Sequence, residues 1–285
     1  NEFGIQSINL SYTNTNITDP NENTQTQSGT FNKIDGTSGQ IGSFNLQRDT
    51  TYTVADEWLL VPLDVASLPD LSGYGNTYDL QQAMVRDTSG QLKALVEQFV
   101  AEQDVNVRNT LMEGILFKWT GSEAIDPASR GGEFDARKLA VIEKLLGQSF
   151  VAFGSPNPND LAAPLLAQTY ESLFEMQYAQ IMAQTHLKHV YDTITYTWDE
   201  TTQKLKGDLN PAISELMANP GMSNAPQEFL RTIHGLRAED MFDLVPISNT
   251  FELSNEDAGW QIESAGKEII LGTGGNDVLT SSLNV

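Results

Sequence analysis

The 285-residue sequence contains no cysteine, which excludes disulfide bonds, thiolate metal sites and thiol nucleophiles. Basic side chains are scarce: 16 lysines and arginines stand against 38 aspartates and glutamates, giving a formal net charge of −22. A field of this sign repels nucleic acid and anionic membranes and attracts cations. We therefore expect no nucleic-acid partner, and calcium is the cation that suits a protein rich in carboxylate oxygens.

The sequence also lacks any apolar run approaching the roughly 20 residues that span a bilayer, and no charged-then-apolar leader opens it. We expect no transmembrane segment and an export signal outside this stretch. Both ends are expected to lie within a longer protein, because the chain starts at Asn1 and stops directly after a glycine-rich turn. The 39% hydrophobic and 8% aromatic content nevertheless predicts a real core.

Residues 1–55 are rich in Thr, Asn, Gly, Gln and Ser and contain short alternating stretches, such as 8–13 and 29–33. Turn residues separate these stretches at Asp19-Pro20-Asn21 and at Asp35-Gly36. The pattern predicts a small antiparallel β-meander. It has too few apolar residues to be stable alone, so we expect it to complete a larger β-rich module.

Residues 56–258 change to helical periodicity, with apolar side chains three and four positions apart. Asp135 is expected to cap one helix that Gly147 ends, and a long helix is expected from a cap at Asp160 to about Val190. A β-hairpin is predicted near 193–206, and shorter helices at 211–219 and 226–237. The predicted fold class is α+β, mainly α: a helical bundle with an N-terminal β-meander and an inserted β-hairpin.

Residues 272–279, Gly-Thr-Gly-Gly-Asn-Asp-Val-Leu, match the calcium-binding nonapeptide repeat G-G-x-G-x-D-x-U-x except for Thr273. The glycines permit a tight turn that exposes carbonyl oxygens, and Asp277 adds a carboxylate. Gly272, Gly274, Gly275 and Asp277 are thus the candidate calcium ligands, in a partial site that further repeats would complete. A glycine-rich hairpin or linker is the alternative reading of the same residues.

Residues 2–12 (EFGIQSINLSY) and 28–37 (SGTFNKIDGT) resemble the closing segment of the self-processing module in iron-regulated RTX proteins of Gram-negative bacteria. RTX names the hemolysin-type calcium-binding repeat. The later order is similar too: a helical region, a long helix carrying 184–188 (QTHLK) and then a repeat. This resemblance implies type I secretion to the extracellular space, calcium-dependent folding there and, in some members, calcium-triggered cleavage of an Asp-Pro bond.

The resemblance divides the chain into residues 1–55 as the end of a β-rich module, 56–258 as a helical domain, and 259–285 as the start of the repeat region. The expected function is that of a non-catalytic segment linking the self-processing module to the calcium-binding coil, although the parent protein can be autocatalytic. The alternatives are a part in Asp-Pro autoprocessing and cross-linking, with a lysine such as Lys33 as acceptor, or an adhesion domain that binds a host or surface protein or glycan.

Weaker candidates lie elsewhere. Asp19, Asn21 and Asn23 have the alternating oxygen spacing of a calcium loop but lack its closing Glu, and Asp19-Pro20 is better explained as a turn. His186 and His189 have a metal-compatible spacing without an accompanying carboxylate motif. Glu171 and Glu175 lie four apart, where a solvated helix face is the expectation. No catalytic motif is found, so an enzymatic role has no support in the sequence.

Overall fold

The computed structural model describes residues 4–19, 23–45, 57–251, 261–264 and 267–270. Contacts divide the chain into two compact units, Asn1–Thr51 and Tyr52–Val285. We call the first the sheet unit and the second the helical unit. The division of the chain into a module end, a helical domain and a repeat region stays a prediction.

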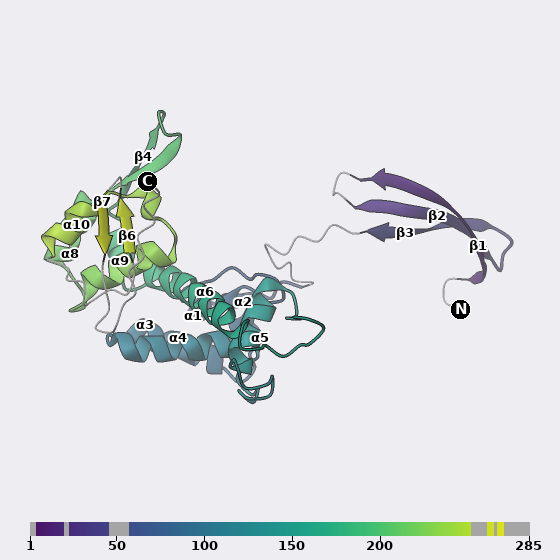
Figure 1. The fold of residues 1–285 in the computed structure, drawn as a ribbon, viewed down its shortest axis with the longest axis horizontal. Coiled ribbons are helices and arrows are strands. Elements are labelled where there is room, and N and C mark those ends of the chain that lie inside the picture. The colour runs from purple at the N-terminus through teal and green to yellow at the C-terminus, as the bar shows by residue number, and fades with distance from the viewer. Residues whose placement is uncertain (1–3, 20–22, 46–56, 252–260, 265–266, 271–285) are drawn as a thin grey trace. The chain divides into compact units, whose positions relative to one another are not determined.

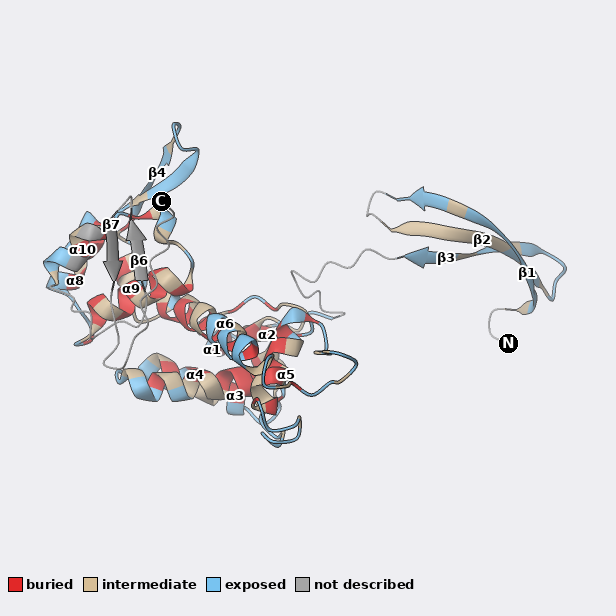
Figure 2. Cartoon of the chain, in the orientation of Figure 1, coloured by how far each residue is buried: buried red, intermediate tan, exposed pale blue. Residues whose placement is uncertain are grey.

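The sheet unit consists of three antiparallel strands in the order β1–β2–β3 (Figure 1). These are β1 Ile5–Thr18, β2 Thr24–Lys33 and β3 Ser38–Asn45. Ile8 lies opposite Phe31, and Gly29 lies between Tyr12 and Ile41, so these side chains share one face of the sheet. Ile8 and Tyr12 are 51% and 62% exposed, and Figure 2 shows how much of the sheet is exposed. The meander is as predicted, with an apolar face that the sheet unit itself does not bury.

The helical unit carries short and long helices around one core (Figure 1). The helices are α1 Leu63–Ala66, α2 Leu80–Arg86, α3 Gln91–Ala101, α4 Val105–Thr120, α5 Ala136–Leu146, α6 Ala163–Gln184, α7 Lys188–Tyr191, α8 Asn210–Ala218, α9 Ala225–Gly235 and α10 Val245–Thr250, with a 3-10 turn η1 at Glu239–Met241. The long helix α6 contacts α4, α5 and α9. It therefore connects helices that lie early and late in the sequence.

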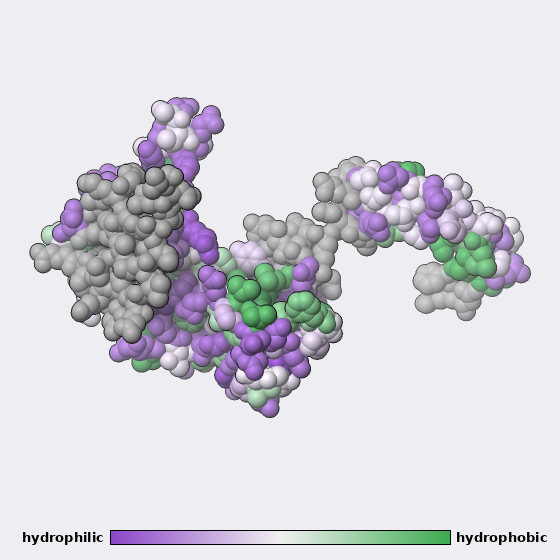
Figure 3. All heavy atoms as spheres, viewed as in Figure 1, coloured by the Kyte–Doolittle hydropathy of each residue, from purple (hydrophilic) through white to green (hydrophobic). Residues whose placement is uncertain are grey.

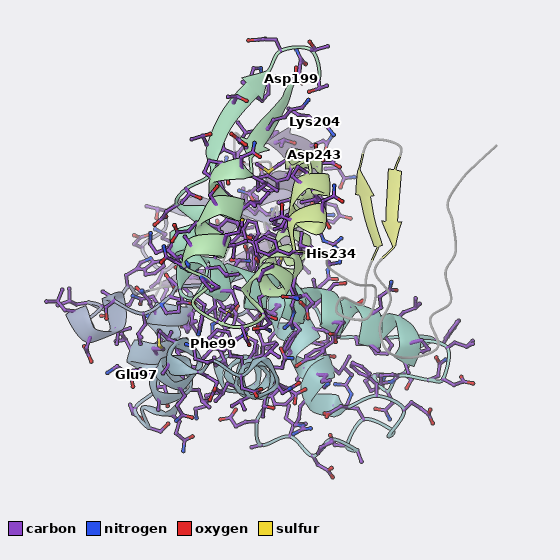
Figure 4. All side chains as sticks on the ribbon, turned by 90° about the vertical axis from the view of Figure 1, so that its left-hand side faces the viewer. Glu97, Phe99, Asp199, Lys204, His234 and Asp243 are labelled. Atoms are coloured by element: carbon purple, nitrogen blue, oxygen red, sulfur yellow. The ribbon has the colours of Figure 1, made fainter. Side chains whose placement is uncertain are left out.

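The core of the helical unit is continuous, and its buried side chains come from almost every helix (Figure 2). Val96, Met112, Leu139, Ile181 and Phe229 are fully buried. Phe99, labelled in Figure 4, meets the Tyr178 ring edge to face at a centroid distance of 5.6 Å. The apolar periodicity that predicted the helices is therefore the pattern that forms this core.

Helix ends follow local sequence signals closely in α5. The Asp135 carboxylate accepts a hydrogen bond from the Arg137 backbone N–H at 2.8 Å, and Gly147 ends the helix in the left-handed conformation at φ 66°. Both predictions are confirmed.

The predicted span of the longest helix was wrong at both ends. The N-cap of α6 is Ala162 rather than Asp160, and the Asn159 carboxamide accepts the hydrogen bond from the Ala162 N–H. At the other end, Thr185 leaves the helical conformation (φ −125°, ψ −99°), so α6 ends at Gln184 and α7 is separate. The Thr185 hydroxyl donates a hydrogen bond to the Ile181 carbonyl at 2.7 Å. Side-chain hydrogen bonds of this kind compete with the backbone hydrogen bonds of a helix.

The inserted hairpin is formed by β4 Thr195–Asp199 and β5 Lys204–Asp208, paired antiparallel. Asp199 and Lys204 flank its connection, as Figure 4 shows. Two short strands, β6 Gln261–Ser264 and β7 Lys267–Ile270, form a second antiparallel hairpin. The described residues confirm the predicted fold class, α+β and mainly α. No helix among them is long and apolar enough to cross a membrane.

Candidate functional site

A surface pocket of about 270 Å³ opens between four helices of the helical unit. We call it the four-helix pocket. Its walls come from α4, α5, α6 and α9, namely Asn109, Thr110, Glu113, Lys138, Tyr170, Glu171, Phe174 and Arg231. Asn109 and Glu113 lie four residues apart on α4, and Tyr170 and Phe174 four apart on α6, so each pair occupies one helix face.

Two ion pairs hold the charged walls in place. Lys138 Nζ lies 2.9 Å from Glu113 Oε1 and 4.7 Å from the centroid of the Tyr170 ring. Arg231 donates two hydrogen bonds to Glu175, at 2.7 and 2.8 Å, in the bidentate geometry that suits a guanidinium and a carboxylate. These pairs join α4 to α5 and α6 to α9.

Three polar groups of the four-helix pocket have no such partner. Among the residues that the structure describes, Glu171 forms no ion pair. The buried Asn109 Oδ1 and Tyr170 Oη atoms have no hydrogen-bond partner within the same ranges. Tyr170 is only 3% exposed. Burial and the nearby Glu113 and Glu171 carboxylates raise the pKa of Tyr170, so its hydroxyl stays protonated. A buried polar atom without a partner is costly, so these two atoms are the least satisfied polar groups among the residues that line the pocket.

Glu171 is an exposed residue at the rim of the pocket, but neighbouring protein atoms partly shield its carboxylate from water. This burial, followed by repulsion from Glu175, raises the pKa of Glu171. The expected solvated face is therefore only half right. Glu175 is paired with Arg231, whereas Glu171 forms no ion pair among the described residues and is only partly compensated by the more distant Lys138 and Arg231.

A buried ionic network lies next to the pocket and shares Arg231 with it. Arg108 is fully buried and donates to Glu228 Oε2 at 3.1 Å and to Tyr178 Oη at 3.0 Å. The same guanidinium donates to the backbone carbonyls of residues 102 and 103 at 3.2 and 2.8 Å. Tyr178 donates to the same Glu228 oxygen, and burial together with this carboxylate raises the pKa of Tyr178. The network ties α4, α6 and α9 together and satisfies their buried charges internally.

The residues predicted to form the calcium repeat, Gly272, Gly274, Gly275 and Asp277, lie outside the described residues, as does Asn21. Asp19 and Asn23 lie in the connection between β1 and β2. Both carboxylate oxygens of Asp19 accept hydrogen bonds from Asn23, each at 3.0 Å. The Asp19 N–H also donates to the Asn23 carbonyl at 2.9 Å, so these contacts join the end of β1 to the start of β2. Within the described ranges, no group of three or more His, Asp or Glu side chains is arranged to hold a metal ion.

His186 and His189 do not share a helix face, because His186 lies in the break between α6 and α7 and His189 lies in α7. His186 Nε2 meets the Glu102 carbonyl at 2.8 Å, and burial lowers the pKa of His186. His189 Nε2 meets the Asn219 carbonyl at 3.0 Å. Each imidazole therefore contacts a different backbone carbonyl, and the two rings share no partner among the described residues.

The sequence did not reveal Asn109, Lys138 or Arg108 as site residues. Each is a polar residue in a helix of ordinary composition, and no local motif marks it. The sequence does show that Asn109 and Glu113, and likewise Tyr170 and Phe174, are four positions apart and so share a helix face. This spacing does not predict which helices pack against each other.

The chain is similar to the iron-regulated protein FrpA of Neisseria meningitidis serogroup C, with 28% identity over 123 residues. The match covers 43% of this chain and spans about 11% of the length of that protein. No protein-family model matches the chain, and no solved structure is significantly similar to it. The similarity to an iron-regulated protein agrees with the resemblance to iron-regulated RTX proteins in general. It does not identify the segment.

Proposed function

We propose that this chain is a non-catalytic structural segment of a large, secreted, RTX-type calcium-binding protein, and that it links a self-processing module to the calcium-binding repeat coil. The observation that supports this role most directly is the closed core of the helical unit. Its buried residues run from Val65 to Ile247, and the fully buried Arg108 is neutralised by Glu228 within the same unit. We expect a unit with such a core to fold without calcium, as a spacer beside a calcium-dependent coil requires.

The partial similarity to an iron-regulated protein and the repeat motif at 272–279 support the same placement. Calcium, in this proposal, binds mainly at the repeat coil, where Gly272, Gly274, Gly275 and Asp277 supply part of the first turn. Secretion to the extracellular space follows from the RTX resemblance.

The proposal is tested by recording circular dichroism and thermal unfolding of the 285-residue chain in EDTA and in millimolar calcium, with magnesium as the control. We expect the helical signal to be complete in EDTA and, at a common ionic strength, the melting temperature of the helices to be the same in all three conditions. A version extended through several further repeats should gain β-structure with calcium alone, because a repeat coil needs about three repeats to be stable.

Two outcomes would contradict the spacer role. Loss of the helical signal in EDTA would make calcium part of the helical fold. Tight calcium binding by the 285-residue chain that is abolished by Asp19→Asn would place the site in the hairpin turn of the sheet unit.

Adhesion is the second candidate, because large apolar side chains are exposed on the helical unit. Phe153 is 98% exposed at φ 51°, and Val151, Leu161 and Leu165 are at least 63% exposed. Figure 3 shows apolar residues gathered on part of the face in view, beside strongly polar areas. A contiguous exposed apolar patch is typical of interaction surfaces. A role in Asp-Pro processing or cross-linking has no comparable support from the described residues.

A further inference from the structure

One face of the β4–β5 hairpin is apolar and exposed. Tyr196 lies opposite Gly207, and Trp198 lies opposite Leu205. Because paired and alternating positions of a hairpin share a face, these side chains form one continuous surface. Trp198 is 57% exposed, Tyr196 45% and Leu205 40%, and Figure 2 shows that most of the hairpin is exposed.

The base of the hairpin is anchored to the helical unit, whereas its outer part is not. A Cβ atom at Gly207 would lie 2.3 Å from the Phe242 ring, so this ring covers Gly207. The Tyr196 ring also meets Phe242, at a centroid distance of 6.3 Å. Figure 4 shows Asp199 at the outer end of the hairpin, beyond this anchor. The Trp198–Leu205 pair is therefore presented outward from a fixed base.

The outer edge of β4 lacks the features that protect an edge strand. Among the strands that the structure describes, β4 pairs with β5 alone. Edge strands of monomeric proteins are commonly protected by Lys, Pro or a bulge. β4 reads Thr-Tyr-Thr-Trp-Asp, and its pairing with β5 has no register shift. Thr, Tyr and Trp favour strands, and a two-stranded sheet is marginal in water, so this edge suits the addition of a further strand.

β4 is complementary to a second copy of itself. Two β4 strands placed antiparallel about a twofold axis at Thr197 overlap over their whole length. In this register Tyr196 lies beside Trp198 of the second copy on the apolar face, and Thr197 lies beside Thr197 of the second copy on the other face. Asp199 is the charged residue of β4, and it lies beside Thr195 of the second copy. No like charges therefore meet along β4.

The charge of the hairpin also permits two copies to approach. Residues 195–208 contain three acidic and two basic side chains, a net charge of −1 against −22 for the chain. Asp199 is paired with Lys206 at 2.7 Å, and Lys204 with Asp240 at 2.8 Å. The hairpin is thus a nearly neutral part of an acidic protein. The repulsion that remains between two whole chains is screened by salt.

We propose that β4 is a self-association edge, at which two copies of this chain pair β4 with β4 antiparallel about Thr197. The product is a four-stranded sheet in the order β5–β4–β4–β5, with the Tyr196 and Trp198 rings of both copies in one stripe. Such a contact is smaller than a standard interface of about 1,600 Å², so the dimer is weak, with a dissociation constant on the order of tens to hundreds of micromolar. This association does not depend on the spacer role proposed above.

Analytical ultracentrifugation of the 285-residue chain tests the proposal from about 5 to 500 µM in about 300 mM sodium chloride. We expect the weight-average mass to rise from the 31.3 kDa of one chain toward twice that value. At about 50 mM sodium chloride the association should weaken several-fold, because the repulsion between the two acidic chains is less screened. A mass that stays at one chain across the whole range would overturn the proposal and leave this edge to a strand of a different protein.

A charge at the twofold axis separates this edge from other contacts. In Thr197→Glu the new carboxylate lies opposite Lys206 within its own hairpin, which is a favourable pair. Across the axis, however, two glutamates meet, so dimerisation should weaken at least tenfold. Thr202→Glu makes the same change in net charge in the β4–β5 connection and should leave the dissociation constant unchanged. Circular dichroism melting shows that both variants are folded, and equal association by the two would contradict the β4 edge.

A single thiol tests the register itself. The chain has no cysteine, so Thr197→Cys provides the one thiol available for oxidation. Directly opposite residues of antiparallel strands have Cα atoms about 4.5–5.5 Å apart, within the roughly 4.4–6.8 Å that a disulfide spans. We expect this variant to form a covalent dimer under mild oxidation by oxidised glutathione. Thr202→Cys is also exposed but lies away from its copy in this register, so it should form far less. Similar yields from the two variants would indicate random collision and refute the proposed pairing.

Discussion

At the residue scale, Arg108 is the least expected feature of this protein. Among the described residues it is the largest fully buried side chain, and it lies in a chain that has few basic residues. Its guanidinium neutralises Glu228 and bonds the Tyr178 hydroxyl and two backbone carbonyls. A buried charge is tolerated only when its hydrogen bonds are satisfied in this way.

Arg108→Met should therefore destabilise the helical unit by about 3–5 kcal/mol, because it leaves the Glu228 carboxylate buried with only Tyr178 and the more distant Arg231. Urea unfolding followed by circular dichroism measures this change. The control is Lys188→Met, which breaks a pair with Asp192 that is about 60% exposed on both sides. That change should cost less than about 1 kcal/mol. Equal effects of the two variants would mean that the buried network contributes no more than a surface ion pair.

At the element scale, the packing of α6 against α9 depends on a close approach at Gly235. A Cβ atom at this position would lie 2.5 Å from the Glu175 carbonyl oxygen and 2.8 Å from the Ala179 Cβ. Both neighbours belong to α6, and the carbonyl is backbone that cannot rotate away. The contact positions Glu175 and Arg231, and through Arg231 one wall of the four-helix pocket.

Gly235→Ala is expected to destabilise the protein by about 1–3 kcal/mol through this overlap. Gly114→Ala is the matched control, because it is also a helical glycine but its nearest contacts are Leu95 side-chain atoms at 3.7 and 3.8 Å. There the alanine should stabilise by about 0.5–1 kcal/mol through helix propensity. Thermal and urea unfolding of the two variants should move in opposite directions, and a shared direction would contradict the assigned role of the α6–α9 contact.

Several elements followed directly from local sequence. The cap at Asp135, the end at Gly147 and the β4–β5 hairpin depend on residues a few positions apart, so the local pattern contained the required information. The end of the longest helix could not be predicted from local sequence. The apolar pattern continues past Gln184 into α7, although the backbone of Thr185 leaves the helical conformation. Periodicity indicates which side chains face a core, but it does not exclude a short break between two helices that use the same core.

At the scale of the whole molecule, the dominant property is the net charge of −22. Even if each of the 16 basic residues neutralised one of the 38 acidic residues, as in the pairs Lys93–Asp64 and Lys118–Glu123, an excess of 22 negative charges would remain. Repulsion among them opposes the compact state. Monovalent salt screens that repulsion, with a Debye length of about 10 Å at 0.1 M.

We therefore expect the melting temperature to rise by several degrees when sodium chloride increases from about 10 to 300 mM, and choline chloride to act equally because screening depends on ionic strength and not on the identity of the cation. Scanning calorimetry measures this change. A response to sodium but not to choline would indicate a specific ion site, and a falling melting temperature would mean that attractive pairs outweigh the net repulsion.

The sequence by itself determined the fold class, most helices, the meander and the acidic character, because these depend on composition and on contacts between near neighbours. Only the tertiary structure decided the four-helix pocket and the buried network. Arg108 and Glu228 are 120 positions apart, and Tyr178 lies 70 positions from Arg108. Their meeting depends on how α6 packs between α4 and α9, and that packing is a collective result of the core rather than of any local pattern.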